Sequence, residues 1–191
     1  MAQEIRRIGE HLIEGVRRLT RRETSDKTRE QPKTLSEQRI HAVREIMPKM
    51  EDENIRAILV FGSVAGGTAT ELSDLDYHII KQRNSGLPGA YEKDDISVIQ
   101  YLSSQLSFPT HPVGSSSLEE IADPTIPDLL LMQLTPPSEL RELGVKTTGF
   151  RDNEKPFITN WVIVARTQKE EAEITDQITK GLEGFKNSKA K

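Results

Sequence analysis

Two aspartates separated by one residue, Asp74 and Asp76, are the side chains in this sequence whose spacing most clearly suggests chemistry. Alternate residues of a strand point to the same face, so the two carboxylates would project together. Like charges held that close repel each other unless a cation lies between them, and hard divalent ions prefer carboxylate oxygens as ligands. The chain has no cysteine, so a metal must be held by oxygen or histidine ligands, which favours Mg²⁺.

The segment upstream of these aspartates is suited to binding a phosphate group beside them. The hydrophobic run at residues 55–61 predicts a buried strand, which Gly62 ends. A glycine lets backbone amides approach a phosphate closely, and the hydroxyl of Ser63 can donate a hydrogen bond to it. A phosphate-bearing substrate is therefore expected next to the metal.

A helix and two strands must position these residues. Thr34 and Glu37 have the spacing of a capping box and a hydrophobic helical face follows, so a helix is predicted over residues 35–50, shortened or kinked by Pro48. Around the aspartates, hydrophobic and polar residues alternate, which predicts a second strand with the core on one face and the carboxylates on the other. Its hydrophobic residues are Leu75, Tyr77 and Ile79.

The rest of the chain completes an α/β (α+β) domain with a mixed twisted sheet, helices packed on one face and the metal site on the other. A third strand is predicted at residues 95–102, and hydrophobic runs indicate further strands. The further strands are expected at residues 129–134 and 157–165, helices at 118–122 and 169–185, and long loops at 103–117 and 135–156.

Residues 1–33 are predicted to be an appendage to a domain over residues 34–185, with a disordered tail at 186–191. Hydrophobic residues at helical spacing predict a helix over about residues 3–22, joined by a polar linker. We expect this helix to dock on the domain or on a second copy, because a helix of this length is marginal alone; an undocked helix and a helix that serves another partner are the alternatives. Its arginine pairs indicate either a solvated face or a contact with nucleic acid or membrane.

The overall charge and hydrophobicity narrow the classes of function. The net charge is −4, so the chain has no global basic field that would drive non-specific nucleic-acid binding. Its first residues lack the apolar run of a signal peptide, and no segment approaches the roughly 20 apolar residues of a membrane span. We therefore expect a cytoplasmic protein without a membrane span.

The order of these features resembles the polymerase-β-type nucleotidyltransferase superfamily, and in particular its minimal nucleotidyltransferase domains. Their motif is a glycine and a serine, a spacer, and two aspartates one residue apart, which Gly62, Ser63, Asp74 and Asp76 match. The resemblance implies that the aspartates hold metal and are catalytic. It also implies that Gly62, Ser63 and Ser73 contact the nucleotide.

The family also has a third carboxylate on a neighbouring strand, for which Asp95 is the candidate here and Asp94 the alternative. Asp95 would then be a third catalytic and metal-binding residue facing the other two. On the strand of the aspartates, His78 is expected either to touch the substrate or tune a metal ligand, or to be a hydrogen-bonded or half-buried histidine. Lys81 is expected either to neutralise a phosphate or to be solvated.

The resemblance implies transfer of a nucleoside monophosphate from a nucleoside triphosphate to a hydroxyl, with release of pyrophosphate and with two Mg²⁺ ions. Family members often have an arginine soon after the serine, whereas this chain has valine, alanine and two glycines at residues 64–67. A weakly active or inactive binding or regulatory module of the same fold is therefore an alternative, as is a nucleic-acid-binding protein. The acceptor stays open among a nucleic-acid end, a small molecule and a protein side chain.

Overall fold

The computed structural model describes residues 34–84, 92–123, 125, 128–145 and 155–187, all within one compact unit, Pro32–Lys191. The predictions for the amino-terminal helix and linker lie outside the described residues. No helix in these ranges is long and apolar enough to cross a membrane.

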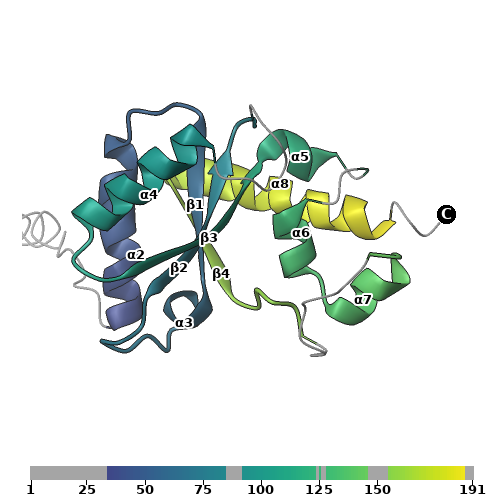
Figure 1. Cartoon of the computed structure of the whole chain (residues 1–191), viewed down its shortest axis with the longest axis horizontal. Coiled ribbons are helices and arrows are strands. Elements are labelled where there is room, and N and C mark those ends of the chain that lie inside the picture. The colour runs from purple at the N-terminus through teal and green to yellow at the C-terminus, as the bar shows by residue number, and fades with distance from the viewer. Residues whose placement is uncertain (1–33, 85–91, 124, 126–127, 146–154, 188–191) are drawn as a thin grey trace, which may run out of the picture. The chain divides into compact units, whose positions relative to one another are not determined.

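Four strands and seven helices follow one another in this part of the chain (Figure 1). In chain order they are α2 (Leu35–Ile46), a 3-10 turn (Met47–Lys49), β1 (Ile55–Phe61), α3 (Gly62–Ala65), β2 (Leu75–Lys81), α4 (Lys93–Gln105), β3 (Thr110–Ser117), α5 (Leu118–Ala122), α6 (Leu129–Leu134), α7 (Pro137–Glu142), β4 (Trp161–Ala165) and α8 (Gln168–Asn187).

The strands form one mixed sheet in the order β3-β2-β1-β4. The β1 strand is antiparallel to both β2 and β4, whereas β2 and β3 are parallel. A parallel pair needs a crossover connection, and α4 lies in the chain between β2 and β3. The predicted mixed sheet of an α+β fold is therefore confirmed.

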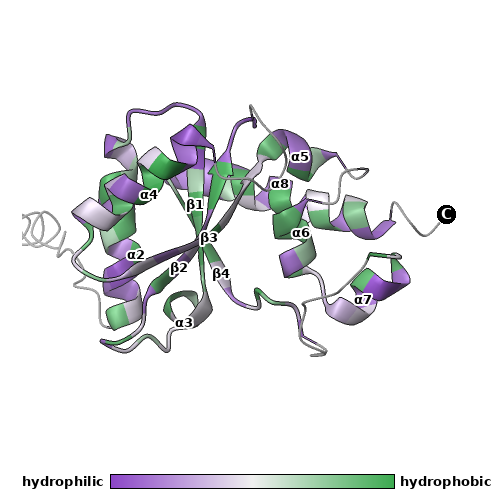
Figure 2. Ribbon diagram, viewed as in Figure 1, coloured by the Kyte–Doolittle hydropathy of each residue, from purple (hydrophilic) through white to green (hydrophobic). Residues whose placement is uncertain are grey.

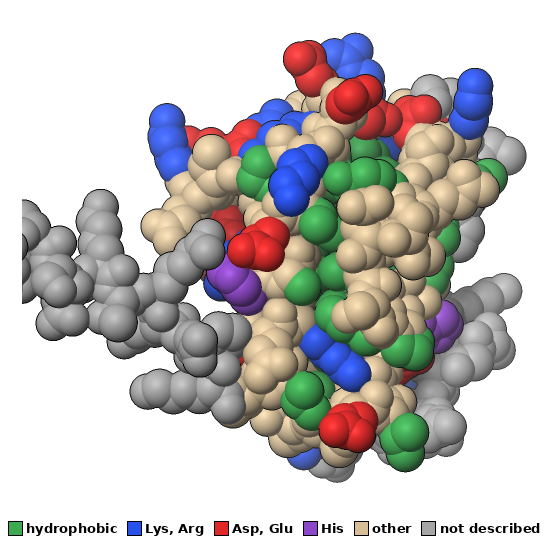
Figure 3. Space-filling view, turned by 90° about the vertical axis from the view of Figure 1, so that its left-hand side faces the viewer, with side chains coloured by type: hydrophobic (Ala, Val, Ile, Leu, Met, Phe, Trp, Pro, Cys, Tyr) green, Lys and Arg blue, Asp and Glu red, His purple; other side chains and the backbone are tan. Residues whose placement is uncertain are grey.

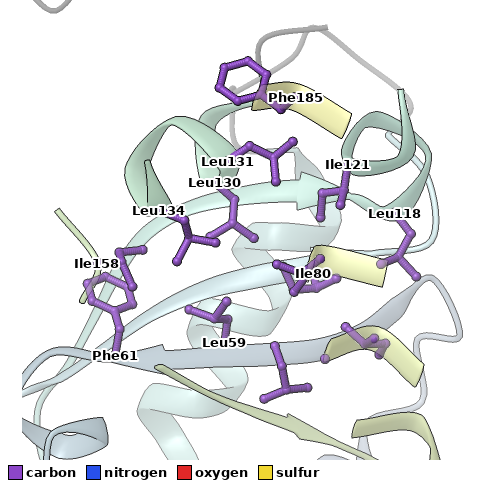
Figure 4. Close-up of a cluster of buried hydrophobic side chains, with 14 of the residues drawn as sticks. Leu59, Phe61, Ile80, Leu118, Ile121, Leu130, Leu131, Leu134, Ile158 and Phe185 are labelled. Atoms are coloured by element: carbon purple, nitrogen blue, oxygen red, sulfur yellow. The ribbon is translucent and has the colours of Figure 1, made fainter. Parts of the chain in front are cut away.

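Helices cover both faces of the sheet, which corrects the prediction of helices on one face. Residues of α2 and α4 form one hydrophobic cluster with the strand residues Ile58, Tyr77 and Ile79. Residues of α5, α6, α7 and α8 form a second cluster with Leu59 and Ile80 on the other face (Figure 4). Bands of hydrophobic and hydrophilic residues alternate along the helices (Figure 2), as expected where one side packs on a sheet. The site is therefore confined to one end of the sheet.

The elements with strong local signals were predicted correctly. Thr34 and Glu37 form the predicted capping box of α2, and Pro48 lies in the 3-10 turn that ends this helix. The β1 and β2 strands and α5 agree with the prediction, and α8 extends the predicted helix to Asn187, into the expected tail. Of the strand predicted at 157–165, β4 forms only the second half.

Three assignments were wrong. Residues 95–102 belong to α4, because Val98 and Leu102, four residues apart, pack together into the first cluster. Residues 129–134 form α6, since a short apolar run fits a helix as well as a strand and Asp128 caps it. The loops predicted at 103–117 and 135–156 contain β3 and α7.

Candidate functional site

The site lies where β1 ends and β2 and β3 begin. Antiparallel pairing brings Phe61, the last residue of β1, directly opposite Asp76, and parallel pairing sets His111 of β3 opposite Asp76 on its other side. Asp74, just before β2, belongs to the same group: one ligand atom from each of Asp74, Asp76 and His111 lies within 4.8 Å of the others. The carboxylates of the two predicted aspartates therefore lie together at this end of the sheet.

Gly62 adopts a conformation that leaves room for Asp76. Its φ of +69° lies in the left-handed region, where glycine is unstrained. A Cβ atom at this position would lie 2.6 Å from Oδ2 of Asp76. Glycine is therefore needed here both for the turn from β1 into α3 and for the position of the carboxylate.

Ser63 follows in α3 and is partly exposed. Its backbone carbonyl accepts a hydrogen bond from the amide of Thr68 at 2.9 Å, which closes the turn after α3. Within the described residues, no hydrogen bond is formed by the Ser63 hydroxyl. The group that was predicted to donate to a phosphate therefore has no competing hydrogen bond in this part of the chain.

Arg39, a residue that sequence reasoning missed, fixes the approach to the aspartates. This arginine of α2 is only 5% exposed and donates to the backbone carbonyls of Ser73 and Glu71. Its guanidinium also lies 5.0 Å from the ring centroid of Phe108. A buried arginine requires such partners. Arg39 lies on the buried face of α2. A charged residue at a position where the helical pattern predicts a hydrophobic one could have identified it from the sequence.

Ser73 stabilises the same turn through its hydroxyl. Its hydroxyl accepts a hydrogen bond from the amide of Thr70 at 2.9 Å and lies 3.2 Å from the hydroxyl of that residue. Together with the contact from Arg39, this bond sets where the chain enters β2. Its predicted contact with a nucleotide is not tested by these bonds.

His111 was missed by sequence reasoning and is the third member of the group. Its Nδ1 lies 3.0 Å from Oδ1 of Asp76, and its side chain is 62% exposed. Pro112 follows it, and a residue before proline is restricted to extended backbone. The amide of Leu75 donates to the carbonyl of Pro109 at 2.9 Å, which ties the start of β3 to β2.

Asp95 is not brought to the two aspartates. It lies in the first turn of α4, fully buried, 3.1 Å from Nζ of Lys81, which is also fully buried. Lys81 ends β2, five residues beyond Asp76 and on its other face, so the two sites are roughly 17 Å apart along the strand. The prediction of Asp95 as the facing third carboxylate is therefore wrong, as is the prediction of a solvated or phosphate-binding Lys81.

The ion pair of Lys81 and Asp95 stabilises the junction of β2 and α4. Lys81 also donates to Glu92 at 2.9 Å, and Asp95 accepts from the backbone amide of Glu92 and from the hydroxyl of Ser115. Buried charges need this number of partners to offset the loss of hydration. The role of Asp95 in this structure is therefore structural.

His78 shares the face of Asp76 but is closed off from solvent. It has no exposed surface, and Nε2 lies 2.9 Å from the hydroxyl of Ser116. Burial lowers the pKa of His78 to about 3, so the imidazole is neutral, although a backbone hydrogen bond at Ser115 acts in the opposite direction. Of the two roles predicted for His78, the structure supports the hydrogen-bonded one, and the residue is fully rather than half-buried.

The donor set at the end of the sheet fits a divalent ion. Two carboxylates and one imidazole converge, and the glycine at residue 62 leaves space around the Asp76 oxygen that points toward it. The carboxylates would supply oxygen ligands of the kind Mg²⁺ and Mn²⁺ accept. Among the described residues, no other group of three such side chains is arranged to hold a metal.

One family model covers the residues of this site. Residues 40–128 match the family model of the nucleotidyltransferase domain, and this range contains the glycine-serine turn, both aspartates and His111. A solved structure titled "Crystal structure of the toxin-antitoxin with AMP-PNP" is similar with 15% identity and a TM-score of 0.40, over 82% of this chain and 90% of that chain. No curated protein matches the chain.

Proposed function

Since residues 40–128 form a nucleotidyltransferase domain, we propose that this chain transfers a nucleoside monophosphate from a nucleoside triphosphate to a hydroxyl acceptor and releases pyrophosphate. The observation that carries the proposal is the convergence of Asp74 and Asp76 beside the turn at Gly62 and Ser63. In a nucleotidyltransferase domain, a triphosphate and its metal ion would bind at this point.

Each residue has a task in this proposal. Asp74 and Asp76 hold a divalent metal ion, Mg²⁺ or a similar ion, at the end of the sheet. When bound, such an ion supplies charge neutralisation for the triphosphate and the departing pyrophosphate. The hydroxyl of Ser63 and the backbone after Gly62 hold phosphate oxygens, and Ser73 lines the nucleotide side. Positioning of this kind supplies much of the rate in phosphate transfer.

The experiment is incubation of the chain with α-labelled triphosphates, a divalent metal and a cell extract, followed by separation of macromolecules and metabolites. Label should pass to one acceptor with the wild-type chain and not with Asp76→Asn. Because the extract supplies the acceptor, the result also identifies it as nucleic acid, small molecule or protein. Equal labelling by the two proteins would contradict the proposal.

A second candidate function is a binding or regulatory module that has kept the fold and lost activity. Two observations favour it: no arginine follows Ser63, and the third carboxylate is absent from the site among the described residues. Isothermal titration with each triphosphate, with and without metal, separates the two. Metal-dependent binding supports the enzyme, and its absence supports the module.

The described surface gives little support to a nucleic-acid-binding function independent of the site. On the face drawn in Figure 3, basic side chains are interspersed with acidic ones, and no large basic patch gathers among the residues coloured by type. Affinity for nucleic acid that falls steeply with salt and survives Asp76→Asn would nevertheless favour this function.

A further inference from the structure

The residue opposite Asp76 on the neighbouring strand is a histidine. The family resemblance implies a carboxylate on a strand next to the one that carries the two aspartates. The neighbours of β2 are β1 and β3, and β3 is the one that begins beside Asp76. The β3 residue paired with Asp76 is His111. The third position of the site therefore offers an imidazole nitrogen instead of a carboxylate oxygen.

His111 is close enough to share an ion with both aspartates. Ligands about 2.0–2.2 Å from a common ion lie at most about 4.4 Å from one another. The ligand atoms of the group already lie within 4.8 Å of one another. Changes of a few tenths of an ångström, within the range of rotamer adjustment for an exposed histidine, bring all three to one ion.

The local backbone holds His111 in this position. Pro112 keeps the histidine extended, and the hydrogen bond from Leu75 to the carbonyl of Pro109 ties the preceding residues to β2. The Nδ1 atom faces the carboxylate of Asp76, so Nδ1 is the nitrogen that would bind the metal. To bind a metal, this nitrogen must be unprotonated, with the proton of the neutral ring on Nε2.

Imidazole changes the ions that such a site prefers. Mg²⁺ is usually held by oxygen ligands alone, whereas first-row transition ions, Mn²⁺ included, bind a mixed set of oxygen and imidazole nitrogen ligands more strongly than Mg²⁺ does. We propose that His111 is the third metal ligand and that it shifts the preference of the site from Mg²⁺ toward a first-row transition ion such as Mn²⁺. This inference rests on the proposed metal-binding role of Asp74 and Asp76.

The test uses the metals alone, without nucleotide. Isothermal titration measures Mn²⁺ and Mg²⁺ affinities for the full chain and for His111→Ala, His111→Asp, Asp76→Asn and His41→Ala. His41 is the matched control, because it is an exposed histidine on α2 whose ring lies 3.3 Å from Glu45. Pulsed electron paramagnetic resonance of bound Mn²⁺ reports directly whether a histidine nitrogen is a ligand.

We expect the ratio of Mn²⁺ to Mg²⁺ affinity to fall about tenfold in His111→Asp, which restores an oxygen ligand, and to stay unchanged in His41→Ala. The nitrogen coupling should disappear in both His111 variants. An unchanged ratio and coupling in these variants, with metal binding lost in Asp76→Asn, would overturn the role of His111 alone. No metal binding by the wild type, or equal binding by Asp76→Asn, would overturn the proposed metal site as well.

Discussion

A Cβ atom on Gly62 would lie 2.6 Å from Oδ2 of Asp76, closer than Cβ atoms approach other heavy atoms in folded proteins. The turn and the carboxylate therefore depend on each other, although they are separated by the whole connection between β1 and β2. The first prediction follows from this contact.

Gly62→Ala should lose metal binding by at least about tenfold, because the new methyl group displaces the Asp76 carboxylate. Gly67→Ala is the matched control: its φ of +75° gives the same backbone strain, about 1 kcal/mol, but nothing lies within 4 Å of its Cβ position. Metal titrations and thermal melts of both variants make the comparison. Equal metal affinity in the two variants would show that Asp76 does not need the space.

Asp95→Asn should destabilise the fold without changing the metal affinity. The substitution removes one partner of the fully buried Lys81, which should cost about 3 kcal/mol, at the low end for a broken buried pair because Glu92 remains. Asp94→Asn, one residue earlier in α4, is the control and should lose little. Urea unfolding measures the free energies of unfolding. A loss of metal binding in Asp95→Asn at unchanged stability would show that Asp95 is a metal ligand after all.

Asp76→Asn should leave the metal-free protein as stable as the wild type or slightly more stable. The substitution removes repulsion between Asp76 and Asp74 and keeps an oxygen near His111. Divalent metal should raise the melting temperature of the wild type and not of the variant. Melts with and without metal test this, and a stability loss typical of a core substitution would indicate a structural role.

Stability should fall as the pH falls below about 6.5, because of His78. Its pKa is about 3 in the folded protein and 6.5 in the unfolded chain, so the unfolded chain binds the proton between these values. The contribution of His78 to the free energy of unfolding then decreases by about 1 kcal/mol per pH unit in that window. Burial raises the pKa of Asp128, which opposes this trend at lower pH.

His78→Gln isolates that contribution, since glutamine can keep the contact with Ser116 and does not titrate. Urea unfolding at pH 7, 6 and 5 should show a shallower decline for the variant than for the wild type. Parallel pH profiles would mean that the acid sensitivity arises elsewhere.

The sequence predicted the parts of the site that depend on local pattern. The run that becomes β1 ends at Gly62, and the alternation around Asp74 and Asp76 is characteristic of a strand, so both signals lie within a few residues. His111 was missed because its place opposite Asp76 depends on the pairing of two strands connected through α4. The proline, the glycine and the three serines of β3 are typical of loops, and this strand forms through its pairing with β2.

Asp95 was assigned to a strand because the hydrophobic residues that follow it fit both the period of a strand and that of a helix. Ile96 and Val98 alternate with polar residues as in a strand, whereas Val98 and Leu102 share a helical face. The capping box between Glu92 and Asp95 begins the helix, but it lacks the serine or threonine that usually marks one. Tertiary packing on β2 decided between the two periods.

The most direct measurement of the central claim is a paired reaction with the same triphosphate labelled at the α-phosphate or at the γ-phosphate, in the presence of metal and the acceptor-containing extract. Nucleotidyl transfer predicts that α-label joins the acceptor while γ-label appears only in pyrophosphate, and that Asp74→Asn and Asp76→Asn abolish both. Label on the acceptor from the γ-phosphate, or transfer that survives both substitutions, would contradict the account.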